Sequence, residues 1–248
     1  MKSYIIAEMY RLRRRRPRLI LLFLVYVAIL IALNLIRDQL TWNTVAFIGT
    51  FETTFGVAGL FVCLVEFLFV YASDFKAGIM QAAIGRGMSR PQVVLAKYLE
   101  IALTNAMSLG ILWLLILGFG YATGARPNGG QILELLVPYV VGILNEVICT
   151  GIAACVLFLL QNAGLAAVIY AVVFWDPLQY ILAFLSEKFK FIVSLHLKDF
   201  CFSMVTARFE AHLILGQLNF PALLLIVLYI LAAYFLTVWI FKRKELEF

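Results

Sequence analysis

The sequence predicts an all-α membrane protein with six transmembrane helices. Of its 248 residues, 64% are hydrophobic and only 14% are charged, whereas roughly a quarter of the residues in an ordinary soluble domain are charged. A soluble fold of this size needs more polar surface than these residues supply. The apolar residues also gather in long runs, and a helical span takes about 20 residues. These observations exclude a secreted disulfide-bonded domain, a disordered chain and a cytosolic enzyme.

The apolar runs predict six spans within one transmembrane domain over residues 1–248. The spans lie at about 19–36, 55–73, 98–121, 132–160, 164–185 and 220–241. The first run lacks the small-residue cleavage pattern of a signal peptide, so we expect it to stay as an anchor. Asp176 and Pro177 interrupt the fifth run, and proline breaks helices. We therefore expect a re-entrant external element between spans 5 and 6, followed by short interfacial helices in residues 186–219.

An amphipathic helix along the inner membrane surface is predicted ahead of the first span. Its apolar side chains share one helical face: Ile5, Ile6, Met9 and Leu12. Glu8 and Arg11 point elsewhere. Such a helix suits the interface between lipid and water.

The placement of charge predicts the orientation. The net charge is +6, and seven of the 20 Lys and Arg residues precede residue 19. With the N-terminus inside, 14 of these cations lie on the inner side and 6 on the outer side. The positive-inside rule therefore places both termini in the cytoplasm of a multi-pass protein of the plasma membrane. We interpret the basic N-terminus as an orientation signal and a contact for anionic lipid, not for nucleic acid.

The cytoplasmic segment between spans 2 and 3, residues 74–97, predicts a short exposed helix. Residues 79–84 favour a helix, which Gly85 and Gly87 end in a sharp turn. Ser89 and Gln92 have the spacing of a capping box, which starts the next helix. A short helix held between two spans is a mechanical handle, because a force on it moves both spans.

This pattern resembles the coupling segment of type-2 ATP-binding-cassette (ABC) exporter permeases. The stretch that carries the resemblance begins at Asp74 and ends at Lys97. Between them lie Gly78, the apolar helix and the segment 85–90. The six spans, the cytoplasmic termini, the inner-surface helix and the re-entrant element extend the resemblance over nearly the whole chain. It implies a coupling helix over residues 75–84, flanked by two arginines, that docks on an ATPase. The coupling residues would be Phe75, Gly78, Ile79, Met80, Ile84, Arg86 and Arg90. The two arginines can equally be ordinary positive-inside residues.

The resemblance also implies partners. The chain has no Gly-x-x-x-x-Gly-Lys-Ser/Thr phosphate loop, so we expect no enzyme activity in it, and ATP and magnesium would bind a separate ATPase subunit. A second permease subunit, identical or similar, would complete the transporter. The substrate suggested by the resemblance is an antimicrobial peptide or another amphipathic toxin, while drugs, lipids and polysaccharides stay open.

Carboxylates inside the predicted spans are candidate functional residues. Glu66 and Glu146 lie in spans 2 and 4, where no Lys or Arg is expected at matching depth. Each is interpreted either as a carboxyl hydrogen-bonded between helices, for example to Ser108, or as part of a substrate path. Glu100 is expected to pair with Lys97 three residues before it.

Two other classes of membrane protein fit the sequence less well. A membrane metalloenzyme needs clustered His and Glu, but His196 and His212 both fall in the external segment without a ligand motif, and no metal site is expected. The four cysteines show no metal-ligand spacing. A secondary transporter usually has matching broken helices in two halves, and only span 5 reads as broken. This transporter and a non-transport assembly protein remain the alternatives.

Overall fold

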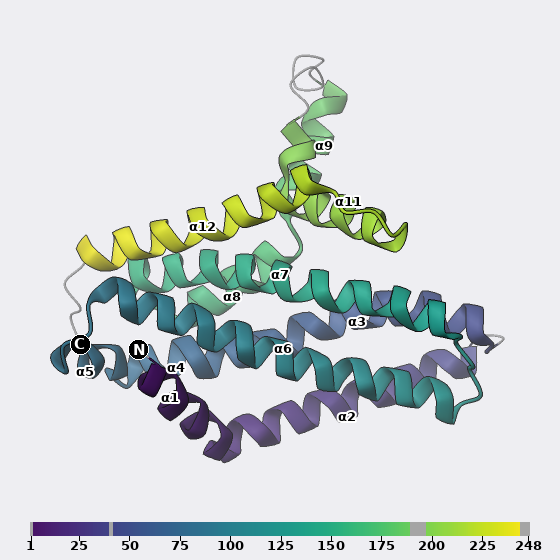
Figure 1. Ribbon diagram of the computed structural model, residues 1–248, viewed down its shortest axis with the longest axis horizontal. Helices are drawn as coiled ribbons and strands as arrows, with labels where there is room; N and C mark the ends of the chain where they lie inside the picture. The colour runs from purple at the N-terminus through teal and green to yellow at the C-terminus, as the bar shows by residue number, and fades with distance from the viewer. Residues whose placement is uncertain (1, 40–41, 189–196, 244–248) are drawn as a thin grey trace. The chain divides into compact units, whose positions relative to one another are not determined.

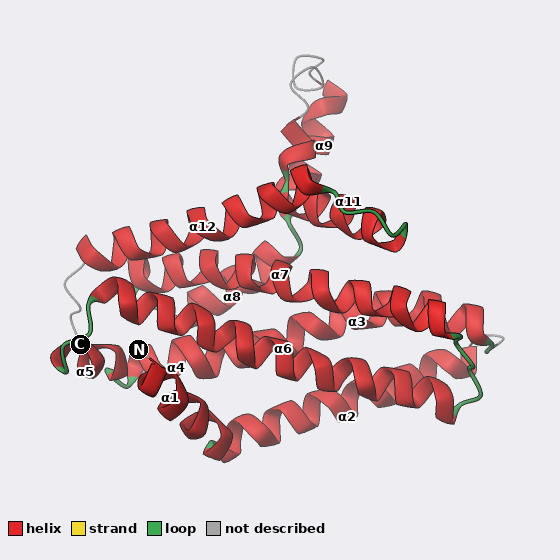
Figure 2. Cartoon of the chain, in the orientation of Figure 1, coloured by secondary structure: helices red, strands yellow, loops and turns green. Residues whose placement is uncertain are grey.

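The structure, a computed structural model, describes residues 2–39, 42–188 and 197–243. All regular elements among these residues are helices, joined by short loops (Figure 2). The predicted all-α class is therefore confirmed for the described part of the chain. Part of the predicted external segment lies outside it, including Phe189, Phe191, Ile192 and His196.

The chain divides into two compact units, Met1–Ile143 and Leu144–Glu247, which we describe separately. Whether they form one domain, as predicted, stays a prediction.

In the first unit, three long helices run side by side (Figure 1). α3 packs most extensively against α6, and α2 contacts both. The elements in chain order are α1 (Lys2–Arg14), α2 (Arg16–Gln39), α3 (Thr44–Phe67), the π-helix η1 (Leu68–Ala72), α4 (Ser73–Lys76), α5 (Ile79–Gly85), α6 (Arg90–Ala122) and the first part of α7 (Gly129–Leu160). A row of buried rings on α3, spaced four residues apart, lines its inner face: Phe47, Phe51 and Phe55.

In the second unit, α11 packs along α12. Its elements are the rest of α7, α8 (Ala163–Phe174), α9 (Pro177–Lys188), η2 (Leu197–Phe200), α11 (Phe202–Ile214) and α12 (Phe220–Arg243). The short helices η2 and α11 agree with the expectation for the described part of residues 186–219.

Within the part of the chain that the structure describes, five helical segments are long and apolar enough to cross a membrane: Arg16–Asp38, Thr44–Lys76, Arg90–Ala122, Gly129–Leu160 and Phe220–Arg243. Each overlaps one predicted span. The fifth predicted span corresponds to α8 and α9, which are bent by 52° and can count as one broken span or as a re-entrant loop.

The predicted break at Asp176 and Pro177 is confirmed. Asp176 has φ +42°, a left-handed conformation in which aspartate is tolerated better than most residues. Its carboxylate accepts hydrogen bonds from the backbone N–H of Ser203 at 3.2 Å and from the Ser203 hydroxyl at 2.6 Å. These bonds hold the bend against the start of α11.

Candidate functional site

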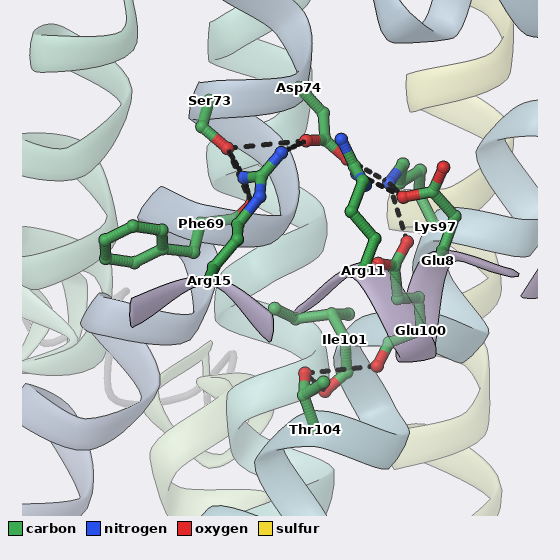
Figure 3. A network of polar contacts seen from close by, with 10 residues as sticks. All are labelled: Glu8, Arg11, Arg15, Phe69, Ser73, Asp74, Lys97, Glu100, Ile101 and Thr104. Carbon is green, nitrogen blue, oxygen red and sulfur yellow. Dashed lines mark hydrogen bonds and ion pairs between the residues drawn. The ribbon is translucent and has the colours of Figure 1, made fainter. Parts of the chain in front are cut away.

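A network of buried charges lies where α1, α4 and α6 meet, next to the segment between the second and third long helices (Figure 3). α1 contributes Glu8 and Arg11, and Arg15 follows at the junction with α2. α4 contributes Asp74, while α6 contributes Lys97 and Glu100. Residues far apart in the sequence are thus joined at one end of the first unit.

Asp74 is the centre of this network. Its side chain has no exposed surface, yet three cations contact it. Arg15 donates a hydrogen bond to Asp74 at 2.9 Å, Lys97 donates one at 2.5 Å, and Arg11 donates a third. A buried carboxylate stays charged only when cations or hydrogen-bond donors compensate it, as they do here. Asp74 therefore ties α4 to α1, to the junction with α2, and to α6.

Lys97 is the second centre, and its side chain is 1% exposed. Its ammonium lies 2.5 Å from Asp74, 2.6 Å from Glu100 and 3.7 Å from Glu8. The three carboxylates offer oxygens within 4.8 Å of one another, a spacing that can hold a metal ion. Since the ammonium contacts all three, the cation that these carboxylates face is the protein's own lysine.

The π-helix η1 directly precedes α4 and contributes contacts of its own to the network. In a π-helix each turn contains an additional residue, and such turns are frequent at functional sites. Within η1 the carbonyl oxygen of Phe69 accepts hydrogen bonds from Arg15 Nη1 at 3.0 Å and from Ser73 Oγ at 2.7 Å. Arg15 also donates to Ser73. The irregular turn thus has a side-chain partner in Arg15, at the junction between α1 and α2.

α1 does not present the predicted apolar face as one exposed surface, because Leu12 is 1% exposed, and two polar side chains of α1 are turned into the protein. Glu8 is 7% exposed and Arg11 is part-buried, whereas Ile6 and Tyr10 are 60% and 57% exposed. Burial acts to lower the pKa of the Arg11 guanidinium, but Asp74 and Glu8 outweigh this effect and raise it. Burial raises the pKa of Tyr4 to about 12, so this phenol stays neutral beside the network.

A second buried ion pair corrects a prediction. Glu66 was expected to have no Lys or Arg at its depth, and this is wrong because Arg18 reaches it from α2. Arg18 Nη2 and Nε donate to the two carboxylate oxygens of Glu66 at 2.7 and 2.8 Å. Ser108 Oγ adds a hydrogen bond at 2.5 Å, as the hydrogen-bonded interpretation of Glu66 expected. Two parallel N–H···O bonds of this kind form a strong and geometrically specific pair.

The other candidate carboxylates, Glu100 and Glu146, have different partners from that of Glu66. The predicted pair of Glu100 with Lys97 is confirmed at 2.6 Å. In the second unit, Glu146 is 2% exposed and accepts a hydrogen bond from the Tyr170 hydroxyl. A role of Glu66 or Glu146 in a substrate path stays a prediction.

The segment between the second and third long helices contains two short helices. The resemblance implied one helix over residues 75–84, but α4 ends at Lys76 and α5 begins at Ile79. The break falls at Gly78, whose φ of +64° is a left-handed conformation that glycine adopts without strain. The predicted turn after α5 is present, with Gly87 at φ +91°. The capping box also starts α6 as predicted, since Gln92 Oε1 accepts from the Ser89 backbone N–H at 3.0 Å.

The predicted coupling residues fall into a buried and a more exposed group. Phe75 and Met80 are buried at 5% and 3% exposure, and α5 contacts both α4 and α6. Ile79, Ile84 and Arg90 are half-buried, and Gly78 lies in the turn between the two short helices. Arg86 is exposed together with Gly85 and Gly87 at the end of α5.

Sequence reasoning missed the roles of Arg11, Arg15 and Arg18. Their i, i+4 and i+7 spacing is that of one helical face, but the chain is not helical at Arg15, between α1 and α2, so this spacing does not account for the contacts. These three arginines contact buried acids, while Arg14 and Arg16 between them are exposed.

The long apolar helices indicate a membrane-embedded, multi-pass protein. Comparison of the chain with protein-family models, with curated proteins and with solved structures gave no match.

Proposed function

We propose that the chain is the membrane-spanning permease subunit of an ATP-driven ABC exporter, with a separate ATPase acting on α5. The observation that carries this proposal is the position of α5 in the chain. This seven-residue helix connects the segment that ends with α4 to the long helix α6. The residue before Phe75 is the fully buried Asp74, which anchors α4.

The contacts of α5 with its neighbouring helices support transmission of force. A push on the exposed turn at residues 85–87 displaces α5, which contacts α4 and α6 directly. Because Asp74 binds Arg11, Arg15 and Lys97, a displacement of α4 is shared by α1, α2 and α6. A network of several bonds moves as a unit, whereas a single surface ion pair contributes little. The ATPase would therefore tilt the first unit as one body.

Two kinds of partner follow from this function. ATP and magnesium would be bound by the ATPase, since this chain has no phosphate loop. A second permease subunit would form the other half of the pathway. The substrate proposed is an amphipathic molecule such as an antimicrobial peptide, exported from the cytoplasm across the plasma membrane.

The test is co-purification from the native host. The tagged chain is extracted in a mild detergent, and its partners are identified by mass spectrometry and an ATPase assay. We expect a phosphate-loop ATPase in stoichiometric amount. A preparation that lacks any ATPase even after crosslinking would overturn the proposal.

A matched pair of variants locates the docking surface. At Gly85 an added Cβ meets nothing within 4 Å, and the same holds for Gly129 at the start of α7. We expect Gly85→Trp to abolish recovery of the ATPase and Gly129→Trp to leave it unchanged, at equal expression. Equal recovery from both variants would exclude α5 as the docking element.

A further inference from the structure

A groove of about 610 Å³ lies in the first unit between α1, α2 and α6. This volume falls within the ~300–1,000 Å³ of pockets that accept small molecules. Its walls are mostly apolar side chains, among them Met9, Leu19, Leu22, Phe23, Met107 and Ile111.

The groove is elongated along the helices. On α2 its lining runs from Arg18 to Tyr26 and on α6 from Thr104 to Ile111. At a rise of about 1.5 Å per residue these stretches are about 12 and 10 Å long. Arg16 begins a candidate membrane span, so the α1 end of the groove lies at a membrane surface. A mostly apolar groove that runs along the helices from a membrane surface can take a segment of a lipid acyl chain.

The inner wall of the groove is electrically neutral, because its one charge is compensated. Arg18 lines the groove, but its guanidinium is held by both oxygens of Glu66. The Tyr26 hydroxyl donates to the Ser108 carbonyl at 2.9 Å, and the Ser108 hydroxyl donates to Glu66. The polar groups on this wall therefore have partners within the protein, and hydrocarbon can lie against them.

The rim of the groove carries uncompensated positive charge. Arg11, Arg15 and Arg18 are paired with acids, whereas Arg14 and Arg16 are exposed and form no ion pair with the residues that the structure describes. Arg14 stacks on the ring of Tyr10, a lining residue, with 4.6 Å between Cζ and the ring centroid. Arg16 precedes the lining residue Leu19 by three positions, which places both on one face of α2.

We propose that this groove binds one anionic phospholipid, with an acyl chain between α1, α2 and α6 and the headgroup phosphate at Arg14 and Arg16. Basic pockets between transmembrane helices at a membrane surface suit anionic headgroups. A zwitterionic lipid fills the groove equally well but gains less from the two arginines. The proposal does not depend on the function proposed above, since it rests on the groove and its rim alone.

The experiment measures lipid retention by native mass spectrometry of the purified full-length chain in detergent. The probes are dioleoyl-phosphatidylglycerol, which is anionic, and dioleoyl-phosphatidylethanolamine, which has the same chains and no net charge. We expect one anionic lipid to be retained with a clear preference over the zwitterionic one. At about 1 kcal/mol for each arginine near the surface, this preference amounts to about thirtyfold in affinity.

Two variants separate the headgroup from the chain. The double variant Arg14→Gln/Arg16→Gln is expected to abolish the preference, whereas Arg37→Gln/Arg126→Gln removes two arginines elsewhere and should keep it. Met107→Trp fills the groove and is expected to reduce retention of both lipids about tenfold. Its matched control is Leu114→Trp, which lies on α6 beyond the groove and is 62% exposed. If Met107→Trp does not fold, Ile111→Phe fills the same groove with a smaller addition.

Three results would overturn the proposal. Equal retention of the two lipids by the unaltered chain would show that the headgroup is not recognised. A preference that survives the loss of Arg14 and Arg16 would place the anion elsewhere. Unchanged lipid retention by a folded groove-filling variant would show that the acyl chain lies outside the groove.

Discussion

Asp74 has no exposed side-chain surface and three cationic partners, so its charge matters more than its size. Removing one member of a buried ion pair leaves an uncompensated charge, which typically costs about 3–5 kcal/mol. The amide of asparagine occupies nearly the same space as the carboxyl but cannot compensate the three cations.

We expect Asp74→Asn to lower the free energy of unfolding by about 3 kcal/mol. The measurement is denaturant-induced unfolding in detergent micelles, followed by helical circular dichroism. The control is Asp38→Asn, since Asp38 is 54% exposed and forms its ion pair with its sequence neighbour Arg37. A loss of less than about 0.5 kcal/mol in Asp74→Asn, the range of ordinary surface substitutions, would contradict a central role for Asp74.

The pair of Arg18 with Glu66 is tested by a double-mutant cycle. Arg18→Gln, Glu66→Gln and their combination should give a coupling energy of about 2 kcal/mol, because the two side chains are buried and share two hydrogen bonds. The comparison cycle uses Arg208 and Asp199, which are 44% and 33% exposed at a separation of 3.5 Å. There we expect less than about 1 kcal/mol. Similar values in the two cycles would show that burial adds nothing to the Arg18 pair.

At the scale of elements, the close contact of α3 with α6 depends on a glycine. A Cβ added at Gly120 would lie 2.4 Å from Cζ of Phe47. Phe47 is 1% exposed and has ring contacts with Trp42 and Phe51, so it has little room to move.

We therefore expect Gly120→Ala to destabilise the protein by about 2 kcal/mol, in the range of overpacked cores. Gly118 on the same helix has open space around its Cα, so Gly118→Ala should be neutral or stabilising by up to about 1 kcal/mol. Unfolding measured for both variants tests the difference. Phe47→Leu introduced beside Gly120→Ala should recover part of the loss, and a lack of any recovery would place the strain elsewhere.

The long helices could be predicted because a membrane span has a minimum apolar length, but their ends could not. The second span was expected to begin at residue 55, whereas α3 begins at Thr44. Polar residues before residue 55 lower the hydropathy without ending the helix, since Thr50 and Thr53 donate hydrogen bonds back to carbonyls four residues earlier. Hydropathy thus locates the apolar part of a helix and not its full extent.

The candidate site was predicted only in its local parts. The turn at Gly87 and the pair of Lys97 with Glu100 follow from neighbours in the sequence, and both were anticipated. The contacts of Asp74 with Arg11 and of Glu66 with Arg18 join residues 63 and 48 positions apart. Such contacts depend on how α1 and α2 pack against the other helices, and helical periodicity in a single sequence does not specify that packing.

At the scale of the whole molecule, the asymmetry of Lys and Arg leads us to infer that the turn after α4 and the loop before α7 lie on opposite sides of the membrane. The four native cysteines are buried and none forms a disulfide bond, so they can be replaced before thiol labelling without breaking a covalent link.

We expect Arg126→Cys, introduced into a chain whose native cysteines are replaced by alanine, to react with a membrane-impermeant maleimide on intact cells. Lys76 is also exposed, and we expect Lys76→Cys to react only after the membrane is permeabilised. Labelling in the reverse order would invert the orientation, and labelling of both residues on intact cells would contradict opposite placement.

The π-helix η1 has a consequence for how this chain tolerates changes in length. Losing one residue from its five-residue stretch would restore a regular α-helix. Because a π-turn holds about one residue more than an α-turn, the segment downstream would keep nearly the same orientation relative to α3. Asp74 would then still face Arg15. A single-codon deletion is thus absorbed in residues 68–72, whereas the same deletion in the regular part of α3 would rotate the rest of the helix by about 100° and turn Asp74 away from Arg15.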